Sequence, residues 1–331
     1  MRPIAFSILV LLLCLTARAD EKHPRPQILG IAGVHFYSTN VKATRDFYAH
    51  VLGPEAFSDG CLWCEGMPFK GKTESPEIAH GFPATARVGL EQQVMLSDLP
   101  KNAAPDLLAE ISFLTSDLGE LENFLKASGV PFAERKTHRK SGNGVLLSVL
   151  VDDPEGHKVS FVGPERVFTM PSASGDSGWA PQNPLYLMRI IHAGFVVRDR
   201  AAEDKFYKDI LGFHVYWHGG MKEGEDNWVD MQVPDGTDWI EYMLRVSPDA
   251  SHKTLGVMNH IALGVPDIQA AKEQLIKNGF KPTEEPKIGR DGKWQLNLYD
   301  PDETRVELME FKPTKEPCCS PYTGPHPGPP Q

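Results

Sequence analysis

Apolar and polar residues alternate along the chain in a unit that recurs four times. Each unit starts with an apolar strand, continues into an amphipathic helix and closes with a glycine; the segments are GVHFYSTNVKATRDFYAHVLG (33–53), EISFLTSDLGELENFLKASG (110–129), HAGFVVRDRAAEDKFYKDILG (192–212) and HIALGVPDIQAAKEQLIKNG (260–279). Apolar residues recur at three- and four-residue steps in the helical parts, which is typical of one buried helix face. The closing glycines occupy the place of a left-handed C-cap. Short alternating runs after each helix predict strands.

The four units are arranged in two pairs. The first and third share DFYAHVLG and KFYKDILG, and the second and fourth close with DDPEGHKVSFV (152–162) and YDPDETRVELM (299–309). This order predicts two tandem domains of two units each. We place them at residues 28–166 and 188–312, with a Pro/Ser/Gly-rich linker at 167–187 and a Pro-rich tail at 313–331, whose end PYTGPHPGPPQ (321–331) we expect to be disordered.

The first twenty residues have the pattern of a secretory signal. A basic start is followed by an apolar run over residues 4–15 and by Ala17-Arg18-Ala19, and that run is too short for a membrane span. We therefore expect cleavage after Ala19 and a secreted or periplasmic protein. No second apolar run of spanning length follows, so a membrane-embedded function is not expected.

The acidic balance excludes one class of partner. The formal net charge is −10, and cleavage would remove Arg2 and Arg18 and take it to −12. A chain of this charge is not expected to bind nucleic acid or an anionic membrane. A small-molecule substrate remains as the expected partner, and a homodimer stays open.

Four cysteines follow the signal, namely Cys61 and Cys64 in CLWC and Cys318 and Cys319 in PCCS. In an oxidising compartment an even count favours disulfides. A bridge between the neighbours Cys318 and Cys319 would be strained, so we expect the tail pair to bond to the CLWC pair. A redox-active Cys61–Cys64 pair and a four-thiolate zinc site are the alternatives.

Two histidines and two glutamates occupy matching places in the third and fourth units. His192 and His260 lie in the first strand of each unit, and Glu241 and Glu307 lie in the last strand, 49 and 47 residues later. If the two units pack about a pseudo-twofold axis, the four side chains converge on one point. Two imidazoles and two carboxylates suit one divalent metal such as Zn²⁺, Ni²⁺, Co²⁺, Mn²⁺ or Fe²⁺. A metal would also relieve the repulsion between the carboxylates.

Taken one at a time, these residues have a simpler interpretation. A lone strand histidine is more often hydrogen-bonded or half solvated than a ligand, and a strand glutamate usually faces water. The match across the repeat favours the metal site over coincidence.

At these residues the chain resembles the vicinal oxygen chelate superfamily, which includes glyoxalase I, bleomycin- and fosfomycin-resistance proteins and extradiol ring-cleaving dioxygenases. The segments HIALGV and RVELME resemble sequence motifs of that superfamily. The resemblance covers residues 28–312 and implies an α+β fold, in which four βαβββ modules form two tandem open β-barrels. It also implies that His192, Glu241, His260 and Glu307 are the complete glyoxalase I ligand set.

The first domain departs from this pattern. Aligning it on the second domain puts Gly33, Gln93, Glu110 and Ser160 in the four ligand places. We therefore expect a structural or substrate-shaping half without the metal. A degenerate first barrel before a metal-bearing second barrel also resembles the layout of extradiol dioxygenases.

The resemblance implies an exported, metal-dependent, glyoxalase-like lyase or isomerase that acts on a metal-chelated carbonyl or enediolate of a small molecule. Glu307 is the candidate base, and Glu241 holds the metal or shares the proton. True lactoylglutathione lyase activity is not expected, because Val196 and Arg245 stand where small bacterial glyoxalase I has an arginine and an asparagine that help to hold glutathione.

Two other functions stay open. An extradiol-type dioxygenase would use His192, His260 and Glu307 as its iron triad, although Glu241 would then occupy a further place on the metal. A non-enzymatic, ligand-sequestering protein of the bleomycin-resistance kind ranks third, since such binders generally do not keep a full metal set.

Overall fold

The computed structural model describes residues 23–53, 84–88, 92–101, 106–138, 145–163 and 188–329. The expected signal sequence and linker, and both cysteines of CLWC, lie outside these residues. Within the described part of the chain, no helix is long and apolar enough to cross a membrane.

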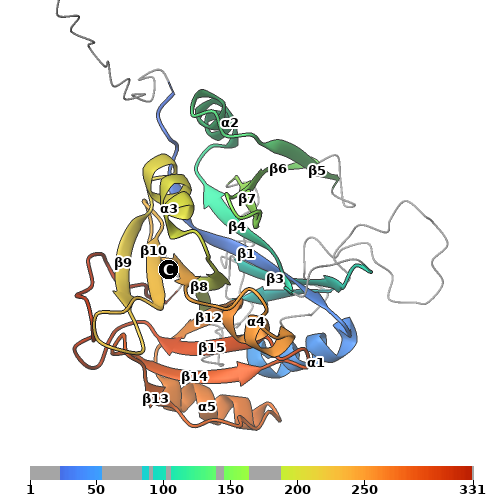
Figure 1. Ribbon diagram of the computed structural model, residues 1–331. Coiled ribbons are helices and arrows are strands. Elements are labelled where there is room, and N and C mark those ends of the chain that lie inside the picture. Colours follow the sequence, from blue (N-terminus) through green and yellow to red (C-terminus); the bar gives the residue numbers. More distant parts are fainter. Residues whose placement is uncertain are drawn as a thin grey trace, which may run out of the picture.

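The first two units form one mixed sheet of seven strands in the order β2-β3-β1-β4-β7-β6-β5 (Figure 1). Its elements are β1 (Ile28–Ser38), α1 (Val41–Leu52), β2 (Ala84–Val88), β3 (Gln92–Asp98), β4 (Leu108–Thr115), α2 (Leu118–Ala127), β5 (Ala133–His138), β6 (Val145–Asp152) and β7 (Lys158–Val162). We call this part the first half.

The last two units form a second mixed sheet of eight strands in the order β13-β14-β15-β12-β8-β11-β10-β9. Its elements are β8 (Arg189–Val196), α3 (Arg200–Glu203), the π-helix η4 (Asp204–Ile210), β9 (His214–Gly219), β10 (Trp228–Gln232), β11 (Trp239–Met243), α4 (His252–Met258), β12 (His260–Val265), α5 (Ile268–Lys277), β13 (Lys287–Ile288), β14 (Trp294–Tyr299) and β15 (Arg305–Glu310). We call this part the second half.

The sequence signals for helix ends are confirmed. Asn40 and Asp117 cap α1 and α2 through their side chains, and Asp267 does the same for α5, as short polar side chains do at N-caps. All four closing glycines have a positive φ; they are Gly53, Gly129, Gly212 and Gly279. The expected α+β class and the repeated order of strand, helix and further strands are therefore present.

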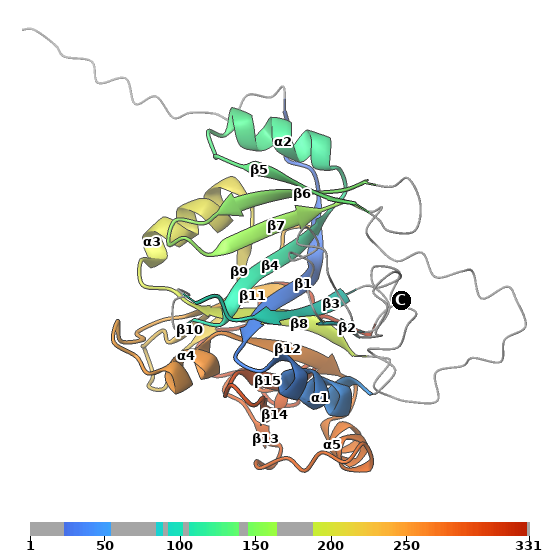
Figure 2. The ribbon, with the colours of Figure 1, turned by 90° about the vertical axis from the view of Figure 1, so that its right-hand side faces the viewer.

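Side chains of the first half pack directly against side chains and backbone of the second half. Figures 1 and 2 show α1 of the first half beside α5 of the second, where the rings of Phe47 and Phe280 meet edge to face at 5.5 Å. At the centre, the side chain of Gln92 bonds to the backbone of Ile190 in both directions. Because Gln92 is buried, these bonds satisfy polar groups that water cannot reach.

The tail differs from the expected disorder. Residues 313–329 run past both edges of the second sheet: Thr323 N donates to Tyr216 O of edge strand β9 at 3.0 Å, and Cys318 N donates to Arg290 O beyond β13 at 2.8 Å. The ring of Tyr322 also packs on that of Tyr216, with centroids 4.7 Å apart. Unpaired edge groups offer a ready backbone partner, which orders a segment whose composition alone predicts none.

The expected cysteine pairing is wrong. Cys318 is bonded to its neighbour Cys319, so neither is available to Cys61 or Cys64. The tail is held instead by the second half, where Trp217 Nε1 donates to Cys318 O at 3.1 Å.

Candidate metal centre

Strand pairing brings His192, Glu241, His260 and Glu307 to one face of the second sheet. Gly194 on β8 lies opposite both Glu241 and His260, and Ala262 on β12 lies opposite both His192 and Glu307. Directly paired residues point to the same side, and so do residues two apart on one strand. The register therefore places all four side chains on one side of the four central strands.

The four side chains meet. His260 Nε2 lies 3.1 Å from His192 Nε2 and 3.2 Å from Glu241 Oε2. His192 Nε2 lies 3.8 Å from Glu241 Oε2 and 3.7 Å from Glu307 Oε2. The ligating atoms of His192, Glu241 and His260 are all within 4.8 Å of one another, and Glu307 stands beside this triad.

A glycine makes room for the second histidine. A Cβ added to Gly194 would lie 2.1 Å from Cε1 of His260, which no packed structure tolerates. His260 Nδ1 is 2.8 Å from Met258 O; a carbonyl only accepts, so Nδ1 carries the proton. The lone pair of His260 is then on Nε2, which faces Glu241. That is the tautomer a metal requires, fixed by a backbone carbonyl.

The charge at this centre calls for a cation. Burial lowers the pKa of both His192 and His260 well below the usual histidine value, so both rings are neutral. Burial raises the pKa of Glu241 and of Glu307 to about 7, and the Arg305 guanidinium partly opposes each shift. The residues present therefore fit a divalent metal: two neutral imidazoles and two carboxylates whose buried charge is otherwise costly.

Arg305 supplies a positive charge at the same place. Its Nη2 donates to His260 Nε2 at 2.6 Å and lies 4.0 Å from Glu241 Oε2. Strand alternation puts Arg305 on the face of Glu307. A metal on His260 Nε2 would take the lone pair that Arg305 now uses, so the guanidinium would have to turn toward the bound substrate or solvent.

Several polar groups around the centre were not found from the sequence. Asp230 lies opposite Glu241 and is buried, and Lys293 is fully buried with its Nζ 4.4 Å from the centre of the Trp239 ring. The Trp239 ring in turn lies 4.9 Å from the His192 ring. Asp230 Oδ1, Lys293 Nζ and Trp239 Nε1 have no hydrogen-bond partner among the residues that the structure describes. A usable signal is the alternation Lys293, Gln295, Asn297, which puts Lys293 on the face of Glu307.

The corresponding face of the first half has other residues. Gly33, Glu110 and Ser160 stand where the sequence places them, since His35 pairs with Glu110 as Gly194 pairs with His260. The fourth place is corrected. His35 lies opposite Met95 whereas Gly194 lies opposite Glu241, so Met95 takes the place of Glu241 and Gln93 does not.

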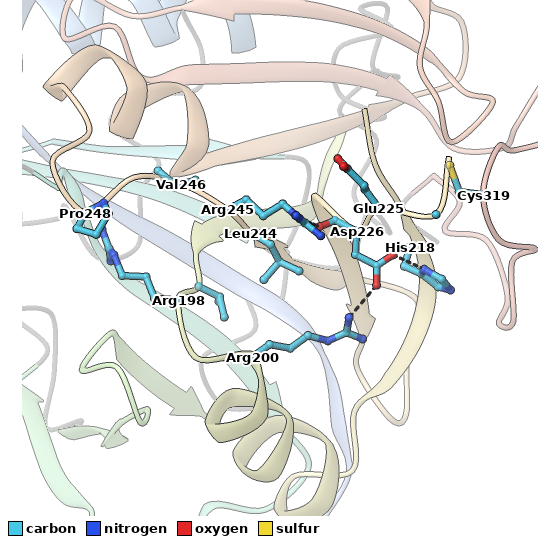
Figure 3. A pocket seen from close by; sticks show the side chains of 12 residues that line it. Arg198, Arg200, His218, Glu225, Asp226, Leu244, Arg245, Val246, Pro248 and Cys319 are labelled. Carbon is cyan, nitrogen blue, oxygen red and sulfur yellow. Dashed lines mark hydrogen bonds and ion pairs between the residues drawn. The ribbon is translucent and has the colours of Figure 1, made fainter. Parts of the chain in front are cut away.

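A pocket of about 790 Å³ opens beyond the ends of β8 and β11 (Figure 3). Arg198, Arg200 and Arg245 line it together with His218 and Asp226. Figure 3 shows Asp226 between Arg200 and His218, which it binds at 2.9 and 2.8 Å. The pocket therefore lies past the ends of β8 and β11, the two strands that carry His192 and Glu241. By contrast, Val196 is buried in an apolar cluster with Met243 and Leu255.

Residues 189–308 match the family model of the Glyoxalase/Bleomycin resistance protein/Dioxygenase superfamily. The match spans β8 through most of β15 and so contains all four residues of the candidate centre. Over these residues the chain is similar to this superfamily.

Individual members of the superfamily resemble the chain to different extents. A lactoylglutathione lyase of Haemophilus influenzae is 29% identical over 130 residues, which are 39% of this chain and 96% of that one. A homoprotocatechuate 2,3-dioxygenase from Arthrobacter globiformis has 19% identity and a TM-score of 0.57, covering 88% of this chain and 82% of that one. The homoprotocatechuate 2,3-dioxygenase from Brevibacterium fuscum has 20% identity and a TM-score of 0.54, and the match covers 87% of this chain and 82% of that one. These structures share the fold of both halves, and the relatives are enzymes.

Proposed function

We propose that the chain is an exported, metal-dependent enzyme of the glyoxalase type, a lyase or isomerase acting on a small molecule with a carbonyl next to a second oxygen. His192, Glu241, His260 and Glu307 would hold one divalent metal, whose identity among Zn²⁺, Ni²⁺, Co²⁺, Mn²⁺ and Fe²⁺ is left open. Such a metal, when bound, supplies Lewis-acid polarisation of the substrate oxygens.

The observation that carries this proposal is the place of Glu241. Its Oε2 approaches both histidine Nε2 atoms, at 3.2 Å and 3.8 Å. A dioxygenase needs only two histidines and one carboxylate and keeps the remaining places free for O₂ and a catechol. A second carboxylate this close to both histidines favours proton transfer on a chelated substrate over oxygen chemistry.

Glu307 is the proposed base. Its Oε2 lies 3.7 Å from His192 Nε2, beside the tighter triad, so it can reach the substrate carbon without leaving the centre. Burial raises the pKa of Glu307 to about 7, and a carboxylate with a pKa near the working pH both accepts and returns a proton.

The chain's own residues also restrict the substrate. Arg305 at the centre and Arg245 in the pocket can each donate to an oxygen-rich or anionic group. Val196 and Arg245 differ from the glutathione-holding residues expected of glyoxalase I, and an exported enzyme would meet little of that thiol. We therefore propose a substrate other than the glutathione adduct.

A ring-cleaving dioxygenase is the second candidate. It is favoured by the likeness in fold to the two homoprotocatechuate 2,3-dioxygenases over both halves of the chain. It would use His192, His260 and Glu307, with Glu241 standing beside the metal.

Glu241→Ala distinguishes the two candidates. In a glyoxalase-type centre, the loss of this ligand should weaken metal binding roughly 10-fold or more and lower turnover by about 10²-fold or more. Metal content by mass spectrometry and turnover on a panel of α-ketoaldehydes would check this. As the matched control, Glu110→Gln changes a buried carboxylate of the first half and should leave the metal in place.

The dioxygenase candidate predicts the reverse. Glu241→Ala would keep its iron and still consume O₂ with catechols in an oxygen electrode, which would overturn the glyoxalase proposal. Export has its own test, because the mature protein should begin at Asp20 in N-terminal sequencing of the secreted or periplasmic fraction.

A further inference from the structure

Two contacts of the same design join the halves of the molecule. In the first, the turn at residues 153–157 between β6 and β7 meets the start of α3. Glu155 Oε1 accepts from the backbone N–H groups of Arg198 and Asp199 at 2.6 and 2.5 Å. A carboxylate near the N-terminal end of a helix accepts from backbone N–H groups there and interacts favourably with the positive end of the helix dipole.

The second contact repeats this arrangement with the halves exchanged. The turn at residues 300–304 between β14 and β15 meets the start of α1, where Asp302 Oδ2 accepts from Thr39 N at 3.1 Å and from Ser38 Oγ at 2.8 Å. In the internal repeat, Asp302 corresponds to Glu155 and Thr39 to Arg198. Each half therefore binds the backbone just before a helix of the other.

Beneath these caps the two contacts differ in charge. Thr44 on α1 and Thr304 in the second turn are hydroxyl residues, whereas their counterparts Glu203 on α3 and His157 in the first turn are ionisable. We call Asp153, His157 and Glu203 the charged clasp. We call Asp300, Thr304 and Thr44 the neutral clasp, because two hydroxyls stand there in place of the histidine and the glutamate. At the neutral clasp the halves are joined by Asp302, which accepts from Ser38 and Thr39. The fold alone therefore does not require a histidine and a second carboxylate in this kind of contact.

The charged clasp has metal-ligand geometry. One ligand atom each of Asp153, His157 and Glu203 lie within 4.8 Å of one another. His157 Nδ1 is 2.7 Å from Asp153 Oδ2, and Tyr207 OH donates to the same oxygen at 3.2 Å. The three residues come from two elements and from both halves, so whatever binds them bridges the halves.

One carboxylate oxygen of the clasp is left without a partner. Glu203 is fully buried; its Oε1 accepts from Glu155 N at 3.0 Å, but its Oε2 has no hydrogen-bond partner within the described part of the chain. A buried, unpaired carboxylate oxygen beside a second carboxylate is costly. A cation shared with Asp153 and His157 would remove both the unpaired oxygen and the repulsion.

We propose that Asp153, His157 and Glu203 bind a second divalent cation that ties the two halves of the chain together. One imidazole and two carboxylates suit Zn²⁺, Co²⁺ or Mn²⁺, with water completing the coordination. The site is separate from the proposed catalytic centre and has no part in its chemistry.

The neutral clasp supplies the matched variant. The double substitution His157→Thr with Glu203→Thr copies the residues found at Thr304 and Thr44. The full chain, stripped with a chelator and dialysed against Co²⁺, should hold two Co²⁺ per chain by mass spectrometry, and this variant one. Co²⁺ should also raise the thermal midpoint of the variant by less than that of the wild type. His192→Ala with His260→Ala should retain the clasp ion and so also hold one.

The outcomes separate the two sites. If the wild type holds one ion that is lost in the His192/His260 variant and kept in the His157/Glu203 variant, the second site is refuted and the clasp is held by a proton. If the wild type holds one ion and the converse pattern appears, the second site stands and the catalytic proposal fails. Should the double variant misfold, Glu203→Gln keeps the side-chain size and should still lose one Co²⁺; two retained ions would refute the site.

Discussion

The two halves build the same sheet face and fill it differently. In the first half, the polar groups pair with each other: Glu110 binds Arg135 at 2.6 Å, and the hydroxyls of Ser112 and Ser160 meet at 2.7 Å. His35 takes the place that Gly194 leaves open in the second half, and its ring hydrogen-bonds to Ser97 at 2.7 Å. The centre of the first face is therefore occupied by the protein's own side chains.

The same place in the second half has buried polar atoms that bind nothing among the described residues. They are His192 Nδ1, Asp230 Oδ1, Trp239 Nε1, Lys293 Nζ, Asn297 Oδ1 and Arg305 Nε. Each such atom costs about 1–3 kcal/mol unless water or a ligand satisfies it. Arg135 Nε and Ser148 Oγ of the first half also have no partner among the described residues. The comparison teaches that the ligand places of the first half are filled by side chains that bind one another, whereas those of the second half converge on one point that suits a cation.

The largest expected effect comes from removing a histidine of the second half. His260→Ala deletes a ligand nitrogen whose tautomer is already fixed, so metal content should fall from near one ion per centre to a small fraction, and turnover should be lost. Metal analysis after desalting checks it. His35→Ala, which removes a buried histidine from the corresponding face of the first half, should leave the metal content unchanged. An equal loss in both variants would erase the distinction between the halves.

Glu307→Gln should separate catalysis from binding. The amide cannot accept the proton, so turnover should fall by about 10²–10⁴-fold, while the triad of His192, Glu241 and His260 keeps most of the metal. Single-turnover kinetics and metal analysis on the same sample test both statements. Wild-type turnover in this variant would remove Glu307 from the role of base.

His35 should give the first half an acid-sensitive stability. Burial lowers its pKa from 6.5 to about 4, so the unfolded chain binds the proton more tightly. Stability from this group is full above pH 6.5 and is lost as pH falls toward 4, by roughly 3 kcal/mol for a shift of this size. In His35→Gln, the free energy of unfolding measured with urea should fall less between pH 6.5 and pH 4 than in the wild type. Parallel plots of this free energy against pH for variant and wild type would contradict the prediction.

Much of this arrangement can be predicted from the sequence because the repeat carries it. The spacing of His192, Glu241, His260 and Glu307 gives their convergence, and the glycine positions give the helix ends. The misassigned Gln93 has a different origin: which residue faces which depends on strand register, and a slip of two residues keeps the same alternation. Only the observed pairing of His35 with Met95 resolves it.

Other features depend on contacts that no local pattern contains. The tail from residue 313 is rich in proline, yet it is ordered by the unpaired edge of β9 and by the loop after β13. From the sequence alone, Lys293 would be expected to lie on the surface just before β14. It is buried because the rings of Trp239, Tyr216 and Tyr322 pack around its Nζ. Long-range packing of this kind overrides composition.

The most direct test of the account is anomalous diffraction from crystals of the Co²⁺-loaded full chain, recorded at the cobalt absorption edge. We expect a strong peak among His192, Glu241, His260 and Glu307, with ligand distances of about 2.0–2.2 Å. The face that carries His35, Met95 and Glu110 should show none. An empty second-half centre, or a peak on the first-half face instead, would contradict the assignment of the metal to the second half.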